Sequence, residues 1–221
     1  MADVKTPAPE GRRQKRARQT RRSILVAAQE LFVRQGYART TIQEIADQAD
    51  VAWQTVYAVF GGKAAILSAV FDVAVAGDDE PVPMPERLFV QAIAEAGDPR
   101  AKARIFARHL REAGERIAGV LSVIESAAAT DPEIAGLWRE LQDQRLRGMT
   151  MAARAFRDQG ALRPGLSVGR AADILWHYAG PWAYRSFVTG RGWTLDEYEA
   201  WIGDTLYHQL MSPDAPDPAV L

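Results

Sequence analysis

The chain has 221 residues, 48% of them hydrophobic and 25% charged, which is the balance of a globular protein with one or two domains. It contains no cysteine, which excludes disulfides and thiolate metal sites, and its three histidines (His109, His177 and His208) lie far apart, so we expect no metal and no other cofactor. Neither a signal peptide nor an apolar run of about 20 residues is found, which predicts a cytoplasmic protein without membrane contact.

The small net charge of −1 conceals an uneven distribution. Residues 1–64 hold 11 Lys and Arg against 6 Asp and Glu, a net charge of +5. Residues 65–221 hold 16 against 22, a net charge of −6. A basic front half on an acidic body favours a polyanion as partner. Charge alone is equally compatible with a basic tail that only aids solubility.

The first 19 residues are predicted to form a flexible basic arm, because they contain two prolines, a glycine and almost no large apolar side chain. Within this arm, Arg16 and Arg18 are candidates to enter a minor groove or follow phosphates, and the alternative is a solvated tail. Helical periodicity then begins near Ile24 and ends at Gly36, which is a typical stop residue.

Two short helices joined by a tight turn come next, and they are the most informative part of the sequence. One is predicted at residues 42–48, behind the capping box Thr41-Ile42-Gln43-Glu44, and the other at residues 52–59. Helices this short are not stable alone, so they must pack on the preceding helix and on each other. This layout predicts a helix-turn-helix, in which one face of the later helix can enter a major groove about 12 Å wide.

Aromatic and polar side chains are expected on the outer face of the helix at residues 52–59. We expect Gln54 to read adenine and Trp53 to pack against sugars or a thymine methyl. Thr55 and Tyr57 carry hydroxyls suited to phosphate oxygens. The competing interpretation is that Trp53 and Tyr57 are core residues of a small three-helix unit.

Two more phosphate contacts are expected where helices begin. Lys63 opens the next helix directly after two glycines, where its ammonium, the free backbone N–H groups and the helix dipole all favour a phosphate. Thr41 can add a contact from the start of its own helix. Together with the basic arm, these residues favour DNA binding over a purely structural role.

The run from Thr41 to Lys63 resembles the DNA-binding signature of the TetR family of regulators. The elements T-x-x-x-I-A, T-x-Y-x-x-F and G-x-K occur in the family's order and spacing, at residues 41–46, 55–60 and 61–63. The similarity covers about residues 20–70. Family members are usually dimeric repressors whose affinity for an operator falls when a small ligand binds the C-terminal domain, and the resemblance implies the same behaviour here.

Two positions depart from the family pattern. Asp50 stands at a turn position that is usually Gly, and Asp tolerates the left-handed conformation better than most residues. Ala52 stands where Ser is common, so a helix cap and one hydroxyl contact are missing, which predicts weakened or redirected phosphate contacts.

The rest of the chain is predicted to be helical. Helical periodicity is found at residues 86–96, 99–115, 117–129, 132–159, 167–190 and 194–211. Pro181 is expected to kink the helix at 167–190, because its ring clashes with the carbonyl of His177. The tail at 212–221 contains three prolines and is expected to fray.

The last two long helices carry wider apolar faces than one covering layer requires, which predicts a four-helix interface between two copies. The alternative is a monomer in which these helices pack inward. The expected interface residues are Leu175, Ala179, Trp182, Ala183, Tyr198, Ile202 and Leu206.

A ligand pocket is expected among the central helices, where aromatic or polar side chains lie close to apolar faces. Such a lining would suit an apolar or aromatic compound with one polar handle, although a residue of this kind taken singly is more often a core or surface residue than a ligand contact. The candidate lining residues are Phe106, His109, Glu125, Trp138 and Trp176.

The sequence therefore predicts an all-α protein with four parts. These are a basic arm at 1–19, a three-helix helix-turn-helix DNA-binding domain at 20–66, a helical ligand-binding and dimerisation domain at 67–211, and a disordered tail at 212–221. We expect a homodimer that represses from a pseudo-palindromic double-stranded DNA operator and is released by a small-molecule effector. The alternative is a ligand-independent regulator or an activator. An all-α enzyme is a remote third possibility, because no nucleotide-binding glycine loop and no paired Glu-x-x-His motif is found.

Overall fold

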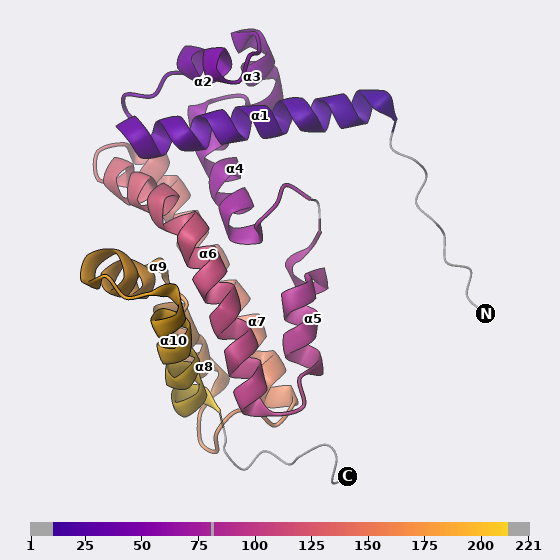
Figure 1. Ribbon diagram of the computed structural model, residues 1–221, viewed down its shortest axis with the longest axis vertical. Coiled ribbons are helices and arrows are strands. Elements are labelled where there is room, and N and C mark those ends of the chain that lie inside the picture. The colour runs from indigo at the N-terminus through magenta and orange to yellow at the C-terminus, as the bar shows by residue number, and fades with distance from the viewer. Residues whose placement is uncertain (1–10, 81, 212–221) are drawn as a thin grey trace, which may run out of the picture. The chain divides into compact units, whose positions relative to one another are not determined.

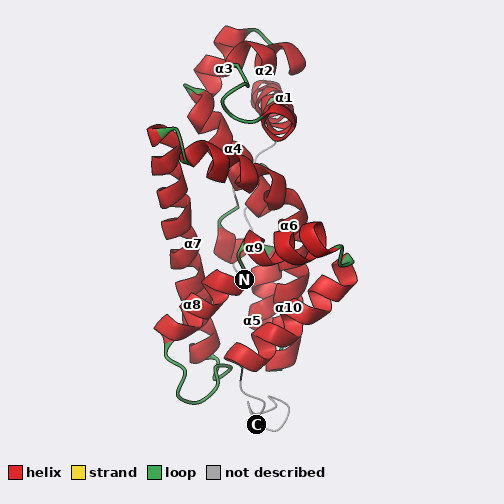
Figure 2. Cartoon of the chain, turned by 90° about the vertical axis from the view of Figure 1, so that its left-hand side faces the viewer, coloured by secondary structure: helices red, strands yellow, loops and turns green. Residues whose placement is uncertain are grey.

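The computed structural model describes residues 11–80 and 82–211, and these residues form helices joined by turns (Figures 1 and 2). Within these ranges the only extended pairing is a single bridge between Leu162 and Met211. The all-α prediction is therefore confirmed. The chain divides into two compact units between Val70 and Phe71, four residues beyond the predicted boundary.

The N-terminal unit is built from α1 (Arg12–Gln35), α2 (Ile42–Gln48), α3 (Trp53–Phe60) and the first half of α4 (Lys63–Ala76). Apolar side chains spaced three or four residues apart on α1 meet those of the shorter helices in one core. Burial of these side chains holds α2 and α3 in place, because helices of seven and eight residues are not stable alone. The fully buried members of this core are Ile24, Ala28, Phe32, Ile45, Ala46, Val56, Ile66 and Leu67.

Helix α1 begins earlier than the sequence predicted. Residues 12–19 of the predicted flexible arm are helical, and residues 1–10 lie outside the described part of the chain. All of the side chains from residue 12 to residue 19 are exposed, so no core holds this stretch. The composition of residues 12–19 explains the difference, because Arg, Lys, Gln and Ala are strong helix formers and this stretch contains no proline.

The C-terminal unit is arranged around α6 (Pro99–Ala128), which contacts α5 (Leu88–Glu95), α7 (Pro132–Asp158) and α10 (Leu195–Leu210). In Figure 1, α6 lies between α5 and α10. The remaining elements complete this unit: a 3₁₀ turn (Met84–Glu86), α8 (Val168–Tyr178), α9 (Pro181–Tyr184) and a π-helical turn (Arg185–Thr189).

Side chains at the helix starts explain where these helices begin. Asp98 and Asp131 accept hydrogen bonds from the first-turn N–H groups of α6 and α7, and each helix has proline in its first turn. Thr194 and Glu197 form the predicted capping box of α10, in which Glu197 Oε2 accepts from Thr194 N at 2.7 Å.

Two predicted boundaries in this unit were wrong. Helix α6 is continuous, although the sequence suggested two helices meeting near residue 116. Gly114 is a packing residue there, because it lets the ring of Tyr184 lie directly against the helix. The predicted kinked helix at 167–190 is instead three elements, because Pro181 begins α9 as its first residue, a position that needs no N–H donor.

The core of the C-terminal unit corrects the predicted interface. Leu175, Tyr198, Ile202 and Leu206 are at most 1% exposed and pack in the chain's own core, so they offer no surface to a second copy. The reason is that α8 and α10 turn their apolar stripes toward each other and toward α6 and α7. The predicted residues that keep some exposure are Ala179, Trp182 and Ala183.

Among the described residues, no single helix is both long and apolar enough to cross a bilayer. Only α3 and α4 taken together, as a bent pair, satisfy that criterion of length and composition.

The contact at Gly114 gives a test of the core. A Cβ at this position would lie 2.7 Å from Tyr184 Cγ, so Gly114→Ala is expected to lower the free energy of unfolding by about 1–3 kcal/mol. The control is Gly148→Ala in α7, where a Cβ meets no atom within 4 Å and stability should be unchanged or slightly raised. Urea unfolding measures both variants, and an equal change in the two would contradict the proposed ring contact.

Candidate functional site

Helix α3 presents two large aromatic side chains to solvent. Trp53 and Tyr57 are each 46% exposed, and their rings meet edge to face with centroids 5.8 Å apart. Gln54 is exposed beside them and Thr55 is half-buried, while Val56 is completely buried. The alternative that Trp53 and Tyr57 are core residues is therefore wrong.

The turn between α2 and α3 fixes the direction of the exposed face. Asp50 adopts a left-handed conformation with φ of 53°, as its place in the turn predicted, and it is the one such non-glycine residue in the described ranges. The N–H of Val51 then donates to Ala46 O at 3.0 Å, which closes the turn. Ala52 precedes α3 without a side-chain cap, so the first N–H groups of α3 receive no side-chain acceptor from it.

Thr41 is occupied by the cap of its own helix. Its Oγ1 accepts from Glu44 N at 3.1 Å, and Glu44 Oε2 accepts from Thr41 N at 2.8 Å. Hydrogen bonds from the Thr41 backbone and hydroxyl lower the pKa of Glu44. Thr41 is exposed, and its contact with a phosphate stays a prediction.

Lys63 performs a structural task that the sequence did not indicate. Its Nζ donates to the carbonyl oxygens of Tyr37 and Thr40, each at 2.9 Å, and lies 4.2 Å from the centre of the Tyr37 ring. Both carbonyls belong to buried residues in the loop between α1 and α2. The ammonium therefore ties the start of α4 to that loop, and its expected phosphate contact stays a prediction.

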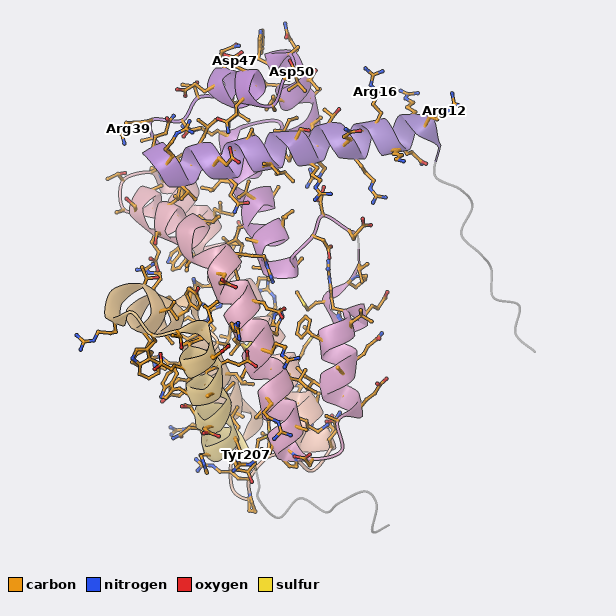
Figure 3. All side chains as sticks on the ribbon, viewed as in Figure 1. Arg12, Arg16, Arg39, Asp47, Asp50 and Tyr207 are labelled. Carbon is orange, nitrogen blue, oxygen red and sulfur yellow. The ribbon has the colours of Figure 1, made fainter. Side chains whose placement is uncertain are left out.

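Positive charge extends along the start of α1. Arg12, Arg13, Lys15, Arg16 and Arg18 are exposed there. In Figure 3, Arg12 and Arg16 extend from α1 on the side where α2 and α3 lie.

The helical turn that follows this charged segment contacts α3. The guanidinium of Arg21 lies 4.8 Å from the ring centre of Phe60, and Phe60 is the last residue of α3. The positive charge of α1 and the aromatic face of α3 thus belong to one folded unit.

The five candidates for a ligand pocket do not form one site. Phe106 packs into the core, and His109 stacks on Phe89 with ring centroids 3.6 Å apart, where burial and then Arg116 lower the pKa of His109 to about 4. Trp138 is half-buried on α7.

Glu125 and Trp176 are joined through residues that the pocket prediction did not include. Glu125 accepts a hydrogen bond from Trp182 Nε1 at 3.0 Å and forms an ion pair with Arg185. The Trp182 ring lies 5.5 Å from that of Trp176, and the guanidinium of Arg145 lies 5.1 Å from both ring centres. We call these five side chains, together with Gln142, the Arg145 cluster.

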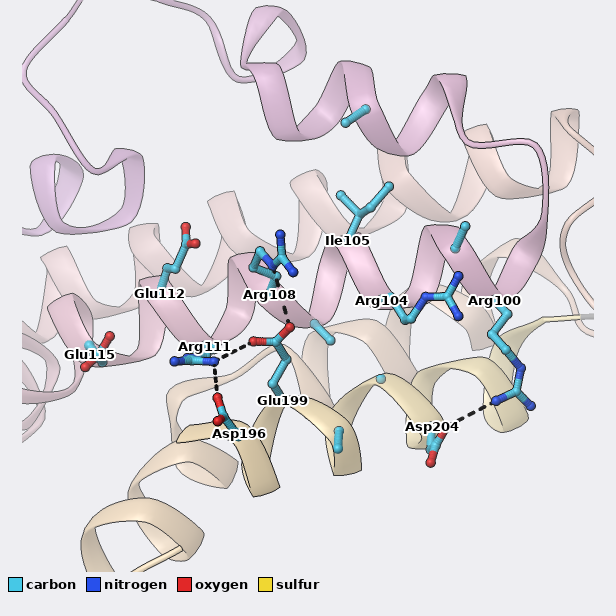
Figure 4. Close-up of a pocket in the computed structure, with 15 residues that line it drawn as sticks. Arg100, Arg104, Ile105, Arg108, Arg111, Glu112, Glu115, Asp196, Glu199 and Asp204 are labelled. Carbon is cyan, nitrogen blue, oxygen red and sulfur yellow. Dashed lines mark hydrogen bonds and ion pairs between the residues drawn. The ribbon is translucent and has the colours of Figure 1, made fainter. Parts of the chain in front are cut away.

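A groove of about 1150 Å³ lies elsewhere, between α6 and α10 (Figure 4). Arginines of α6 face acids of α10 across it, and Arg111 contacts Asp196 at 2.6 Å and Glu199 at 2.9 Å. None of the candidate ligand residues lines this groove. Its charges are largely paired with each other, so it does not have the apolar lining expected of the ligand pocket.

Within the described residues, no group of three His, Asp or Glu side chains is arranged to hold a metal ion.

The geometry of the N-terminal unit defines a class of protein. A three-helix unit in which a short helix follows a tight turn and presents polar and aromatic side chains is a helix-turn-helix DNA-binding domain. Residues 24–70 match the family described as bacterial regulatory proteins, tetR family. This match covers the helix-turn-helix domain and agrees with the resemblance seen in the sequence.

Known relatives extend the likeness beyond the DNA-binding domain. YdeS of Bacillus subtilis, an uncharacterized HTH-type transcriptional regulator, is 28% identical over 173 residues, which cover 77% of this chain and 80% of YdeS. The structure of SmeT in complex with triclosan matches with a TM-score of 0.68 at 21% identity, covering 89% of this chain and 94% of SmeT. NalD of Pseudomonas aeruginosa matches with a TM-score of 0.64 at 19% identity, covering 89% and 99%. The two structures share the fold of this chain.

The hydrogen bonds of Lys63 give a test of its structural role. Lys63→Met is expected to destabilise the N-terminal unit by about 2 kcal/mol, because the carbonyls of Tyr37 and Thr40 lose a charged donor. Hydrogen exchange of amides between residues 20 and 62 measures this loss. The control, Lys15→Met, removes the same charge from an exposed position. Equal protection in the two variants would argue against the structural role.

Proposed function

We propose that the protein is a homodimeric, cytoplasmic repressor that binds a pseudo-palindromic operator through α3 and leaves it when a small molecule binds the C-terminal unit. The observation that carries the DNA-binding part is the exposure of Trp53 and Tyr57 on a helix of eight residues. Such a short helix gains most of its stability by burying apolar side chains, so two half-exposed aromatic rings indicate contact with another molecule.

The residues of α3 suit a major groove. Gln54 carries the donor and acceptor pair that recognises adenine, and Trp53 offers a flat apolar face to sugars or a thymine methyl. Thr55 and Tyr57 supply hydroxyls for phosphates. Two copies of α3 would bind successive major grooves about 34 Å apart, which requires a dimer. Ala179, Trp182 and Ala183 are the predicted interface residues that keep some exposure and so remain available to such a dimer.

The release of DNA by an effector is supported by related proteins. SmeT has been solved with triclosan, and both SmeT and NalD are repressors of multidrug efflux pumps, in Stenotrophomonas maltophilia and Pseudomonas aeruginosa respectively. We infer that this chain also binds its effector in the C-terminal unit, and we assign it no catalytic role because its family consists of regulators.

The role of α3 is tested by fluorescence anisotropy with labelled DNA from upstream of the protein's own gene and with a scrambled duplex. Trp53→Ala is expected to weaken binding to the operator roughly tenfold, because contacts to sugars and a thymine methyl are lost, and to leave binding to the scrambled duplex unchanged. Tyr57→Ala removes a phosphate contact and is expected to weaken binding to both duplexes. Val33→Ala, which shortens an exposed apolar side chain on α1, is the control. Wild-type affinity of both α3 variants would refute the assignment.

The basic start of α1 is tested by the salt dependence of the same binding reaction. In Arg16→Gln/Arg18→Gln the slope of log K against log salt is expected to fall by about 2, because each phosphate contact contributes about 0.9. Arg154→Gln, on an exposed position of α7, should leave the slope unchanged. If the double variant keeps the slope of the wild type, these arginines are solvated and do not contact DNA.

A further inference from the structure

The Arg145 cluster has a guanidinium at its centre. Arg145 Nη2 donates to the carbonyl oxygen of Trp176 at 2.6 Å, and Nη1 donates to Gln142 Oε1 at 2.7 Å. The rings of Trp176 and Trp182 cover the guanidinium. Gly180 permits this close packing, because a Cβ there would lie 2.6 Å from Trp182 Cζ3 and 3.1 Å from Arg145 Nη2.

The positive charge of Arg145 is not balanced by a carboxylate. No described acidic side chain forms an ion pair with it, and both of its hydrogen-bond acceptors are neutral. The carboxylate of the cluster, Glu125, is already paired with Arg185 and Trp182. Burial lowers the pKa of Arg145 to about 10, so the group is still charged at neutral pH and the cluster carries one uncompensated positive charge.

An unused hydrogen-bond donor lies next to this charge. Arg145 can only donate, so the oxygen of the Gln142 amide must face it and the amide nitrogen must face away. That nitrogen, Nε2, is buried and has no hydrogen-bond partner. Buried donors without an acceptor are rare in folded proteins, and such an atom beside an unbalanced cation indicates a missing acceptor with negative charge.

We propose that the effector of this protein is an aromatic carboxylate that binds the Arg145 cluster. Its carboxylate accepts hydrogen bonds from Gln142 Nε2 and Arg145, and its ring packs on Trp176 and Trp182. This inference rests on the proposed function, in which an effector binds the C-terminal unit. Of the ligand-residue candidates, Glu125 and Trp176 belong to this cluster, and Trp138 precedes Gln142 by one helical turn on the same side of α7.

The chemistry of the cluster disfavours other ligand classes. A cationic compound would add a positive charge to one that is already uncompensated, and a neutral compound would leave that charge unbalanced. The two tryptophans, Gln142 and Arg145 are all partly exposed, so part of the cluster faces solvent.

The test compares matched ligands by isothermal titration calorimetry with the full chain. The probes are benzoate, 1-naphthoate, the neutral 1-naphthamide and the cationic 1-naphthylmethylammonium. At least one carboxylate is expected to bind roughly tenfold or more tightly than 1-naphthamide, and the ammonium compound is expected not to bind. Failure of both carboxylates to bind at millimolar concentration, or equal binding of 1-naphthamide, would overturn the proposal.

The variant Gln142→Glu tests the site itself. It replaces the amide, whose nitrogen has no partner, with a carboxylate of nearly the same shape. The new carboxylate can pair with Arg145 inside the protein. We expect the affinity for the carboxylate to fall roughly tenfold or more and the melting temperature to rise. The control, Gln144→Glu, adds the same charge at an exposed position of α7 and should do neither. An unchanged carboxylate affinity in Gln142→Glu would also overturn the proposal.

Operator binding by the wild type and by both variants, measured without ligand, distinguishes a failure of this inference from a failure of the proposed function. If wild-type protein binds DNA but neither carboxylate, the inference fails and the DNA-binding function stands. If a carboxylate binds the Arg145 cluster but does not release DNA, the ligand site stands, whereas the inference that its occupant is the effector fails.

Discussion

The position of α3 in the N-terminal unit depends on the burial of one side chain. Helix α3 has eight residues, and Val56 is the only one of them that is fully buried. The side chains that α3 is proposed to present to DNA are therefore positioned by Val56, by the left-handed turn at Asp50 and by the contact of Arg21 with Phe60. Because so little of α3 is needed for packing, most of its surface is available for recognition. Because α3 buries so little, its neighbours α1 and α4 supply most of the core.

The C-terminal unit uses polar groups in two different ways. Between α6 and α10, arginines and acids pair with each other near the surface, where such pairs contribute little to stability and mainly select which faces meet. In the Arg145 cluster, charge and hydrogen-bonding groups are half-buried and one of each is left unmatched. Unmatched buried groups lower stability, so their retention beside two tryptophans is more readily explained by binding than by folding.

Local patterns predicted much of this structure, and long-range contacts explain the rest. The capping boxes at Thr41 and Thr194 and the turn at Asp50 involve residues close in the sequence, so they were predictable. An apolar stripe, such as the ones that contain Leu175 and Ile202, shows that a helix face is covered but not what covers it. Here other helices of the same chain cover both faces. The environment of Arg145 could not be predicted from the sequence, because it is formed by tryptophans from two later helices and by an amide one helical turn away.

The turn residue Asp50 also bears on how the protein can evolve. An aspartate codon becomes a glycine codon by a single nucleotide change, so the residue usual in the family is one mutation away. That change would relieve a left-handed conformation that disfavours side chains and would remove a negative charge beside the helix that faces DNA. Under the proposed function, operator affinity can therefore increase in one genetic step without altering the residues of α3 that are proposed to read bases. If the protein represses as proposed, tighter repression is one substitution away and needs no change in α3.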